Sequence, residues 1–377
     1  MKAVIAGYAR SPFHFANKGL LAGVRPDDLA SQVVKALLAR TDLDPALLED
    51  VILGCAYPEA SQGNNLARIV GLLSGLPQDV GGMTVNRFCG SSMSAIHIAA
   101  ANIEAGLGDA FLCVGVESMT QVPQGGFNFS PNPWLQEQTD AYVSMGRTAE
   151  NVAERYSIPR GDQERMALES HHKAAAAREQ GRLRDEIVRI QTGTGEWITE
   201  DGCIRPNTSL EALAKLPPAF DENGVVTAGT SSPLTDGASA VLVTSDDFAA
   251  RHNLTPSARI RAVASAGCDP AVMGLGPIPA TRKALARAGL NADDLGVVEI
   301  NEAFASQALA CIDDLHLDPA TVNLDGGGMA IGHPLGATGA RITGKAAALL
   351  QREKVKYALA TQCIGGGQGV ATILEAL

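Results

Sequence analysis

Two similar segments of the chain indicate how it folds. Residues 35–54 read KALLARTDLDPALLEDVILG, and residues 283–301 read KALARAGLNADDLGVVEIN. Each copy predicts the end of a helix, a polar turn and a short buried strand. The segments upstream also correspond, with MKAVIAGYAR at 1–10 and RIRAVASAG at 259–267. Any two α/β units share some of this pattern, but strand, helix and turn matching in order over about 50 residues favours an internal duplication.

Short apolar runs continue to alternate with Ala- and Leu-rich helical stretches along the chain. Strand-like runs lie at 2–6, 51–54, 110–116, 239–244, 259–264, 296–300 and 357–361. This alternation indicates an α/β fold with mixed, mostly parallel sheets that are covered by helices.

Residues 119–235 interrupt the pattern. The part from 120 to 145 is loop-like and contains four of the 16 aromatic residues, helices are predicted at about 146–156 and 160–180, and an irregular stretch follows. Because long irregular insertions in compact proteins are usually functional, we expect this one to cover a site. The predicted organisation is an N-terminal half (1–118 and 236–257), an inserted loop domain (119–235) and a C-terminal half (258–377).

Composition narrows the class of protein. The 377 residues carry a net charge of −11, which argues against nucleic-acid binding. The seven cysteines are irregularly spaced, so a reducing compartment fits better than a disulfide framework. The first apolar run is too short for a signal peptide, and no run reaches the ~18 residues of a membrane span. A cytoplasmic protein without a membrane partner is expected.

The segment VNRFCGSSMSAIHIAAANIEAG, from Val85 to Gly106, contains the first candidate for chemistry. Cys89 stands between a predicted strand and an apolar helix. A thiol at a helix N-terminus is expected to have a lowered pKa, which would favour a nucleophile. Most free cysteines are packing residues, and that reading stays open on this segment alone.

Three later segments add polar groups at strand ends or in glycine-rich loops. His333 lies in NLDGGGMAIGHPLGATGARITG and could accept the proton of a thiol. Cys363 lies in TQCIGGGQG, whose glycines free backbone N–H groups to bind an oxyanion; an inert thiol beside a tight turn is the alternative. Asn301 and Glu302 follow a buried strand, at the edge where α/β folds place their sites, although Asn is also a common helix cap.

Other catalytic signatures are incomplete. Residues 339–345 match most of a phosphate-binding loop, but Ala346 stands where that motif needs Ser or Thr. The chain has no GxSxG, HExxH or CxxC sequence, so a serine hydrolase or a zinc enzyme is unsupported and no metal is expected.

Taken together, the four segments NRFCGSSMSAI, NEAFA, GGGMAIGHPLGATGAR and CIGGGQG resemble the thiolase family, in the family's order. The insertion is similar too, through MGRTAENVA, IRPNTSLEALAKLPPAF and VTAGTSSPLTDGA. The resemblance implies a duplicated fold of two α/β halves in α-β-α-β-α layers. It also implies an acyltransferase that cleaves 3-ketoacyl-CoA with CoA as co-substrate, in a reversible Claisen condensation.

Roles follow from the resemblance position by position. Cys89 would be the acylated nucleophile, and His333 would activate it and help to bind the thioester oxygen. Asn301 would hold a water that completes this first oxyanion hole, and the N–H groups of Cys89 and Gly365 would form a second. Cys363 would exchange the proton at the α-carbon. The positions implied to contact CoA are Met145, Arg205, Phe220, Ala228, Ser232 and Phe304.

Several alternatives remain at this stage. Short-chain thiolases carry a His where this chain has Ser144, which favours a degradative enzyme of β-oxidation over a biosynthetic acetoacetyl-CoA thiolase. A non-catalytic lipid-binding relative would be expected to lose one of the four motifs. An unrelated Cys-His hydrolase would need neither Cys363 nor CoA. Ketoacyl synthases typically use Cys-His-His, so Cys363 points to a thiolase. A homodimer or homotetramer is expected from the family.

Overall fold

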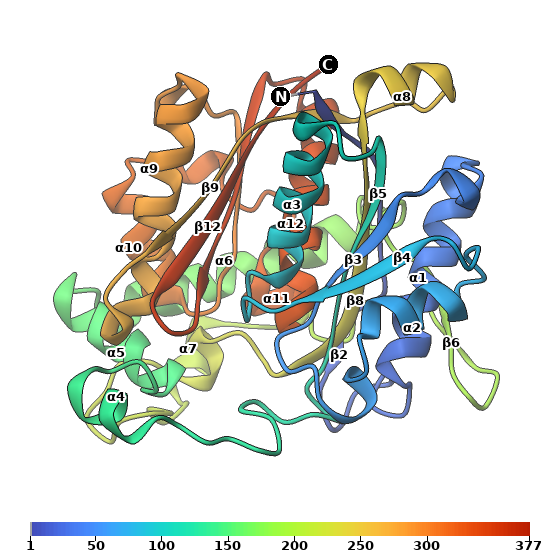
Figure 1. The fold of residues 1–377 in the computed structure, drawn as a ribbon. Helices are drawn as coiled ribbons and strands as arrows, with labels where there is room; N and C mark the ends of the chain where they lie inside the picture. The colour runs from blue at the N-terminus through green and yellow to red at the C-terminus, as the bar shows by residue number, and fades with distance from the viewer. Residues whose placement is uncertain (1) are drawn as a thin grey trace.

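The computed structural model describes residues 2–377 and shows strands and helices in the alternating order predicted from the sequence (Figure 1). The strands are β1 (Ala3–Arg10), β2 (His14–Phe15), β3 (Asp50–Gly54), β4 (Gly81–Val85), β5 (Ala110–Ser118), β6 (Ile190–Gln191), β7 (Trp197–Ile198), β8 (Thr235–Ser245), β9 (Ala258–Gly267), β10 (Val297–Ile300), β11 (Tyr357–Ile364) and β12 (Gln368–Glu375). The helices are α1 (Pro26–Thr41), α2 (Leu66–Leu73), α3 (Ser91–Ala105), α4 (Pro133–Gln138), α5 (Met145–Arg155), α6 (Arg160–Glu179), α7 (Leu210–Ala214), α8 (Asp246–Arg251), α9 (Pro277–Ala288), α10 (Ala305–Asp314), α11 (Gly328–Ile331) and α12 (Leu335–Glu353).

One ten-stranded sheet runs through the molecule. Its order is β10-β11-β12-β9-β1-β8-β5-β3-β4, and β2 pairs with β8 beside this path. Within the first half β1, β3, β4 and β5 run one way and β8 runs the other way. Within the second half β9, β10 and β11 run one way and β12 is reversed. Each half is therefore mixed, with most strands in one direction.

The two halves repeat the same arrangement. The order β3-β5-β8-β1 in the first half corresponds to β10-β11-β12-β9 in the second. In the duplicated sequence, α1 leads through a 3₁₀ turn (Pro45–Leu47) to β3, and α9 leads through a 3₁₀ turn (Ala292–Asp294) to β10. Both helices end at a left-handed residue, Asp42 and Gly289. The duplication predicted from the sequence is therefore confirmed.

Helices α3 and α12 form the central layer between the two halves of the sheet, and they pack on each other as well as on strands from both sides (Figure 1). Helices α1 and α2 cover the outer face of the first half, and α9 and α10 cover that of the second. This gives the α-β-α-β-α layering implied by the family resemblance.

Glycines allow the central layer to pack closely. A methyl group added at Gly339 of α12 would lie 2.3 Å from the backbone nitrogen of Met93 in α3. One added at Gly54, at the end of β3, would lie 2.3 Å from the nitrogen of Ser92. Both distances are far below van der Waals contact, so these glycines set how closely α3 approaches its neighbours.

The segment from 119 to 235 contains α4, α5, α6, α7, β6 and β7. Figure 1 shows α4, α5 and α7 at the lower left of the molecule, whereas α6 crosses its middle. Helix α5 packs on α10, and α6 packs on α10 and α11. This segment therefore lies beside the loops that carry Asn301 and His333.

Lys345, the residue at the lysine position of the rejected phosphate-loop pattern, is buried in an ion network. Its Nζ lies 3.0 Å from Glu186 Oε2 and 2.7 Å from Asp325 Oδ2. Arg10 is also buried and pairs with Glu186 at 2.8 Å and with Asp201 at 2.7 Å. The network joins both halves and the segment between them. Lys345 is thus already paired with internal carboxylates.

We predict that Lys345→Met lowers the melting temperature clearly. Methionine keeps an unbranched side chain as far as the Cε position but removes the charged amine, and breaking a buried ion pair on one side costs about 3–5 kcal/mol. Thermal unfolding followed by circular dichroism measures the change. Lys35→Met is the matched control, since Lys35 is exposed on α1 and its replacement should stay within about 0.5 kcal/mol. Equal melting temperatures for the two variants would contradict a stabilising network.

Within residues 2–377, no helix combines the length and apolar character that a membrane crossing requires. The same residues contain no group of three or more His, Cys, Asp or Glu side chains that could hold a metal ion.

Candidate active site

Cys89 lies in a tight turn between β4 and α3. Phe88, just before it, has a left-handed backbone (φ 44°), which is uncommon for a bulky residue. Hydrogen bonds hold the turn: Phe88 N–H donates to Asn86 Oδ1 at 2.8 Å, and Arg87 N–H donates to Ser91 Oγ at 2.9 Å. Gly90 is the N-cap of α3, so Cys89 precedes the helix by one cap residue. The turn thus presents the thiol at the start of the helix, as the sequence predicted.

The expected low pKa of Cys89 is wrong. Burial, together with the charge of Glu117, raises the pKa of this thiol to about 12. Hydrogen bonds from the backbone N–H groups of Gly365 and of Cys89 itself lower the pKa, but by less than burial raises it. The sulfur is therefore a thiol at neutral pH, and it needs a base to become a nucleophile.

The same two N–H groups define a place for negative charge. Cys89 N–H and Gly365 N–H both face the Cys89 sulfur. Gly365 follows β11 in the turn to β12, where Gly366 and Gly367 take positive φ values of 77° and 80°. Because backbone donors held in a folded turn need no reorganisation, this geometry suits an oxyanion that forms beside the sulfur.

His333 sits in the loop between α11 and α12. Its backbone N–H donates to Thr235 Oγ1 at 3.1 Å, and its side chain is buried, with Nδ1 2.6 Å from Thr338 Oγ1. Burial, with a smaller effect of the Arg341 charge, lowers the pKa of the imidazole to about 3. The ring is therefore neutral at physiological pH and has one nitrogen free to accept a proton.

Asn301 directly follows β10 and is fully buried. Its Nδ2 lies 3.3 Å from His333 Nε2, so the amide contacts the imidazole itself. Its Oδ1 has no hydrogen-bond partner among the described residues. A methyl group at Gly328 would lie 2.8 Å from this oxygen, so the glycine leaves room for it. An unpartnered buried oxygen is suited to accept a hydrogen bond from a water molecule.

Cys363 lies near the end of β11, next to β10, and is buried. The backbone N–H of Asn301 donates to Thr361 O at 3.0 Å, which joins the ends of these two strands. Gln362 Nε2 donates to the carbonyl of Cys89. Burial raises the pKa of the Cys363 thiol well above its ordinary range, and the nearby Cys89 raises it further. Cys363 is therefore protonated at rest and lies within electrostatic reach of Cys89.

These contacts bring the four predicted catalytic side chains to one end of the molecule. His333 contacts Asn301, Asn301 joins the strand that carries Cys363, and Gln362 and Gly365 contact Cys89. The carboxyl ends of β10 and β11 supply two of the four, as expected for an α/β fold.

Several of the residues implied to contact CoA lie on one side of Cys363. Met145 and Phe304 pack in the same apolar cluster as Cys363. Phe220 is partly exposed and meets the Phe304 ring edge-on, with centroids 5.8 Å apart. A methyl group at Gly146 would lie 2.1 Å from the Phe220 ring, so this glycine allows Phe220 to reach the cluster.

Ala228 and Ser232 lie in the segment that leads into β8. Ala228 is exposed in a 3₁₀ turn (Ala228–Thr230), and Ser232 N–H donates to Ala303 O at 2.9 Å, next to Phe304. Arg205 is exposed and lies apart from these contacts. The Arg205 guanidinium is 5.2 Å from the Phe15 ring centroid. The backbone N–H of Arg205 donates to His171 Nδ1 at 3.1 Å. Its charged group is thus free to meet an anionic ligand.

Sequence reasoning missed Glu117, a buried carboxylate at the end of β5. It accepts hydrogen bonds from the backbone N–H groups of Ala56 at 2.8 Å and Gly336 at 2.9 Å, and from Gln62 Nε2 at 2.9 Å. Glu117 thereby joins the start of α12, beside the His333 loop, to the loop after β3. A carboxylate at the end of an otherwise apolar strand was the available signal.

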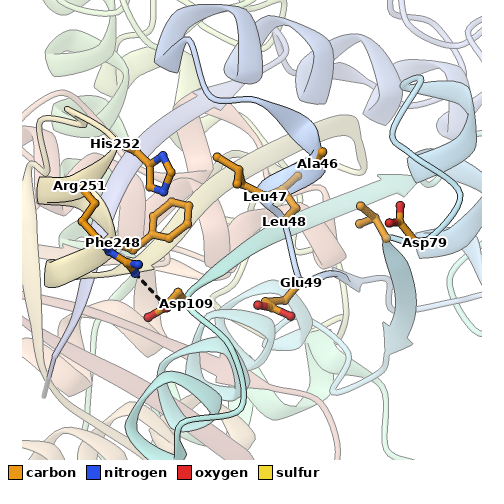
Figure 2. A pocket seen from close by; sticks show the side chains of 10 residues that line it. Ala46, Leu47, Leu48, Glu49, Asp79, Asp109, Phe248, Arg251 and His252 are labelled. Carbon is orange, nitrogen blue, oxygen red and sulfur yellow. Dashed lines mark hydrogen bonds and ion pairs between the residues drawn. The ribbon is translucent and has the colours of Figure 1, made fainter.

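The surface cavity in Figure 2 lies elsewhere. It encloses about 420 Å³ and is lined by residues from 46–49, 79–80, 109 and 248–252. Figure 2 shows the Phe248 and His252 rings close together, with centroids 4.3 Å apart, and Arg251 paired with Asp109 at 3.2 Å. None of the predicted site residues lines this cavity.

The fold and the site define a class of protein: a duplicated α/β protein that gathers two cysteines, a histidine and an asparagine at one end of the molecule. Residues 3–247 match the family profile "Thiolase, N-terminal domain", and residues 254–376 match "Thiolase, C-terminal domain". The chain belongs to the thiolase family, an acyltransferase family, which confirms the resemblance inferred from the motifs.

Relatives match over nearly their full length. The chain is 49% identical to a 3-ketoacyl-CoA thiolase of Saccharophagus degradans, covering 99% of this chain and 97% of that protein. It is 47% identical to a 3-ketoacyl-CoA thiolase of Shewanella denitrificans, with 99% of both chains covered. The crystal structure of human mitochondrial 3-ketoacyl-CoA thiolase is 39% identical and superposes with a TM-score of 0.92 over 99% of this chain and 98% of that one. A structure of the human enzyme in complex with CoA matches with the same TM-score of 0.92 and covers 100% of this chain and 98% of that one.

Proposed function

We propose that this protein is a 3-ketoacyl-CoA thiolase, which cleaves its substrate with CoA to give acetyl-CoA and an acyl-CoA shortened by two carbons. The observation that carries the proposal is the meeting of Cys89, His333, Asn301 and Cys363 at one end of the molecule, with two N–H groups facing the Cys89 sulfur. The names of the full-length relatives support the substrate class.

The first half-reaction uses Cys89 and His333. The Cys89 proton passes to His333 Nε2, and the sulfur attacks the keto carbon of the substrate. The bond between the α-carbon and the keto carbon then breaks, and its electron pair leaves as the enolate of acetyl-CoA. Cys363 donates a proton to that enolate, and its buried, protonated thiol suits this role.

The second half-reaction releases the acyl group. The thiol of CoA gives its proton to the Cys363 thiolate and attacks the acyl-Cys89 thioester. Cys89 leaves and recovers its proton from His333. Two oxyanions form at different places during these steps, and each requires its own donors. In this proposal the Cys89 and Gly365 N–H groups stabilise one, and His333 with a water held by Asn301 stabilises the other.

CoA would bind along the side formed by Met145, Phe220 and Phe304, with Ala228 and Ser232 next to it and no permanently bound cofactor. The aromatic pair and the thioether suit the pantetheine arm. Arg205, exposed and positively charged, would meet a phosphate. Residues 119–235 would form a loop domain that covers this site, between halves made of 1–118 with 236–257 and of 258–377.

The finer assignment is a degradative thiolase of fatty-acid β-oxidation, acting in the cytoplasm as a homodimer or homotetramer. Ser144, at the position where short-chain thiolases carry His, caps α5 by accepting a hydrogen bond from Arg147 N–H at 3.4 Å. A biosynthetic acetoacetyl-CoA thiolase and a non-catalytic lipid-binding relative are the competing assignments.

A thiolysis assay over acyl chain lengths separates these assignments. Purified protein is mixed with CoA and 3-ketoacyl-CoA substrates of increasing length, and the loss of the 3-ketoacyl enolate absorbance is followed. A degradative enzyme should show a kcat/KM on medium or longer chains at least equal to that on acetoacetyl-CoA. Activity confined to acetoacetyl-CoA would indicate the biosynthetic type. A folded protein that binds CoA without consuming any substrate would reject catalysis.

A further inference from the structure

We propose that Thr338 is a positioning residue: it keeps the single proton of the resting His333 ring on Nδ1, so that Nε2 is unprotonated and its lone pair can move from the Asn301 amide to the proton of Cys89. The inference concerns the catalytic histidine and rests on the function proposed above.

The contact between His333 Nδ1 and the Thr338 hydroxyl is short and buried. Thr338 lies in the first turn of α12, five positions after His333, and its hydroxyl oxygen is 2.6 Å from His333 Nδ1. Thr338 is fully buried, and His333 is 4% exposed. A hydrogen bond this short between buried groups must have one donor and one acceptor, because two N–H or O–H hydrogens, or two lone pairs, would repel each other.

A second contact favours the ring as the donor. Thr338 Oγ1 lies 3.0 Å from the carbonyl oxygen of Pro334, one helical turn earlier, and a carbonyl oxygen can only accept. The hydroxyl has one proton, and directing it to Pro334 leaves a lone pair toward Nδ1. The Nδ1 atom must then carry the hydrogen, so Nε2 carries none.

The other side of the ring agrees with this assignment. Asn301 Nδ2, which can only donate, lies 3.3 Å from Nε2. With the proton on Nδ1, Nε2 offers a lone pair to that amide. With the proton on Nε2, an N–H group would face another N–H group. Both neighbours of the ring therefore favour the same tautomer, although they come from different elements, α12 and the end of β10.

The neutral character of Thr338 also matters. A carboxylate at Nδ1 would stabilise the imidazolium, as in a Ser-His-Asp triad. A hydroxyl orients the ring and selects its tautomer without adding negative charge. When the Cys89 S–H bond breaks and the Nε2–H bond forms, the cationic ring is stabilised only weakly, so the proton is held briefly and passed on. The low pKa of His333, caused by burial and by Arg341, fits this arrangement.

Three variants test the inference. Thr338→Val keeps the branched shape but removes the hydroxyl, and Thr338→Ser keeps the hydroxyl. Thr343→Val is the matched control, because Thr343 lies in the same helix, is fully buried and bonds Gly339 O at 2.7 Å in the same way, but it does not bond His333.

The direct readout is the tautomer itself. In protein labelled with ¹⁵N-histidine, the His333 signals are assigned by their loss in His333→Asn. The wild type, Thr338→Ser and Thr343→Val should show a protonated Nδ1 and an unprotonated Nε2. Thr338→Val should show a shift toward the Nε2–H form. A wild-type ring protonated at Nε2 would overturn the inference, and so would an unchanged ring in Thr338→Val.

The second readout is kinetic. Loss of the correct tautomer in a Ser-His-Asp enzyme lowers kcat by about 10⁴-fold, and a neutral partner should matter less, so kcat for thiolysis in Thr338→Val should fall by roughly 100-fold. The KM should change little, and Thr338→Ser and Thr343→Val should stay within about threefold of the wild type. If Thr338→Val does not fold, the wild-type and Thr338→Ser spectra still decide. The spectra need no substrate, so failure of the proposed function would be seen separately, as a wild type without thiolysis.

Discussion

Replacing Cys89 by serine should lower thiolysis by roughly 10⁴-fold or more, as expected when a covalent nucleophile is lost. Serine preserves the turn between β4 and α3 and nearly the same shape. Its hydroxyl, however, is far less acidic than a thiol, and the neutral His333 has a pKa of about 3 and is a weak base. Steady-state rates measure the loss. Mass spectrometry of the intact protein should show an acetyl adduct after incubation of the wild type with acetyl-CoA, and none in Cys89→Ser.

Cys268→Ser is the control for this result. Cys268 is partly buried, and its Sγ approaches Met273 O at 3.9 Å, in a loop next to the turn that contains Gly367. A nonspecific effect of exchanging sulfur for oxygen near the site would appear in both variants. Full activity of Cys89→Ser, or an acetyl adduct in that variant, would remove Cys89 from the mechanism.

The fold was largely predictable because its signals are local. The helix, turn and strand at 35–54 and at 283–301 can be read from periodicity and turn residues within about 20 positions. The pairing of strands was not readable in this way. Strand β8 inserts between β1 and β5, although it follows them by more than a hundred residues, and no local pattern encodes such a partner.

The same distinction separates the site features that the sequence predicted from those that it did not. Cys89, His333, Asn301 and Cys363 were identifiable because each lies in a distinctive short motif at the end of a strand or in a glycine-rich loop. The pKa of Cys89 was predicted wrongly because the helix dipole is a local property, whereas burial depends on tertiary packing, and burial has the larger effect. Glu117 and Thr338 were missed because their roles exist only through partners that the fold brings near, such as Ala56 or the His333 ring.

Replacing Cys363 by alanine should separate acylation of Cys89 from proton exchange at the α-carbon. The variant should still form the acetyl adduct on Cys89, because His333 and the Cys89 turn are untouched and CoA can leave as a thiolate without the proton that Cys363 supplies in the wild type. Exchange of the acetyl-CoA methyl hydrogens with deuterated water should fall by roughly 10²–10⁴-fold, the usual contribution of a general acid or base. Thiolysis should fall similarly. Exchange is measured by mass spectrometry of acetyl-CoA after incubation in deuterated water.

Cys311→Ala controls for the loss of a buried thiol. Cys311 is also fully buried and close enough to raise the pKa of Cys363, but it lies on α10, where its Sγ is 3.3 Å from Gly274 O. Its replacement should leave the exchange rate near that of the wild type. Equal exchange in Cys363→Ala and the wild type would assign the α-proton to another group.

In the proposed mechanism, the electrostatic interaction between the two cysteines sets the order of their steps. After burial, the charge of Cys89 is the largest influence that raises the pKa of Cys363. A Cys89 thiolate therefore keeps Cys363 protonated until the sulfur has attacked the substrate. Once Cys89 carries an acyl group it has no charge, and the Cys363 proton is lost more easily. Acylation thus prepares the second thiol to act as a base, so the exchange in Cys89→Ser should fall together with acylation even though Cys363 is intact.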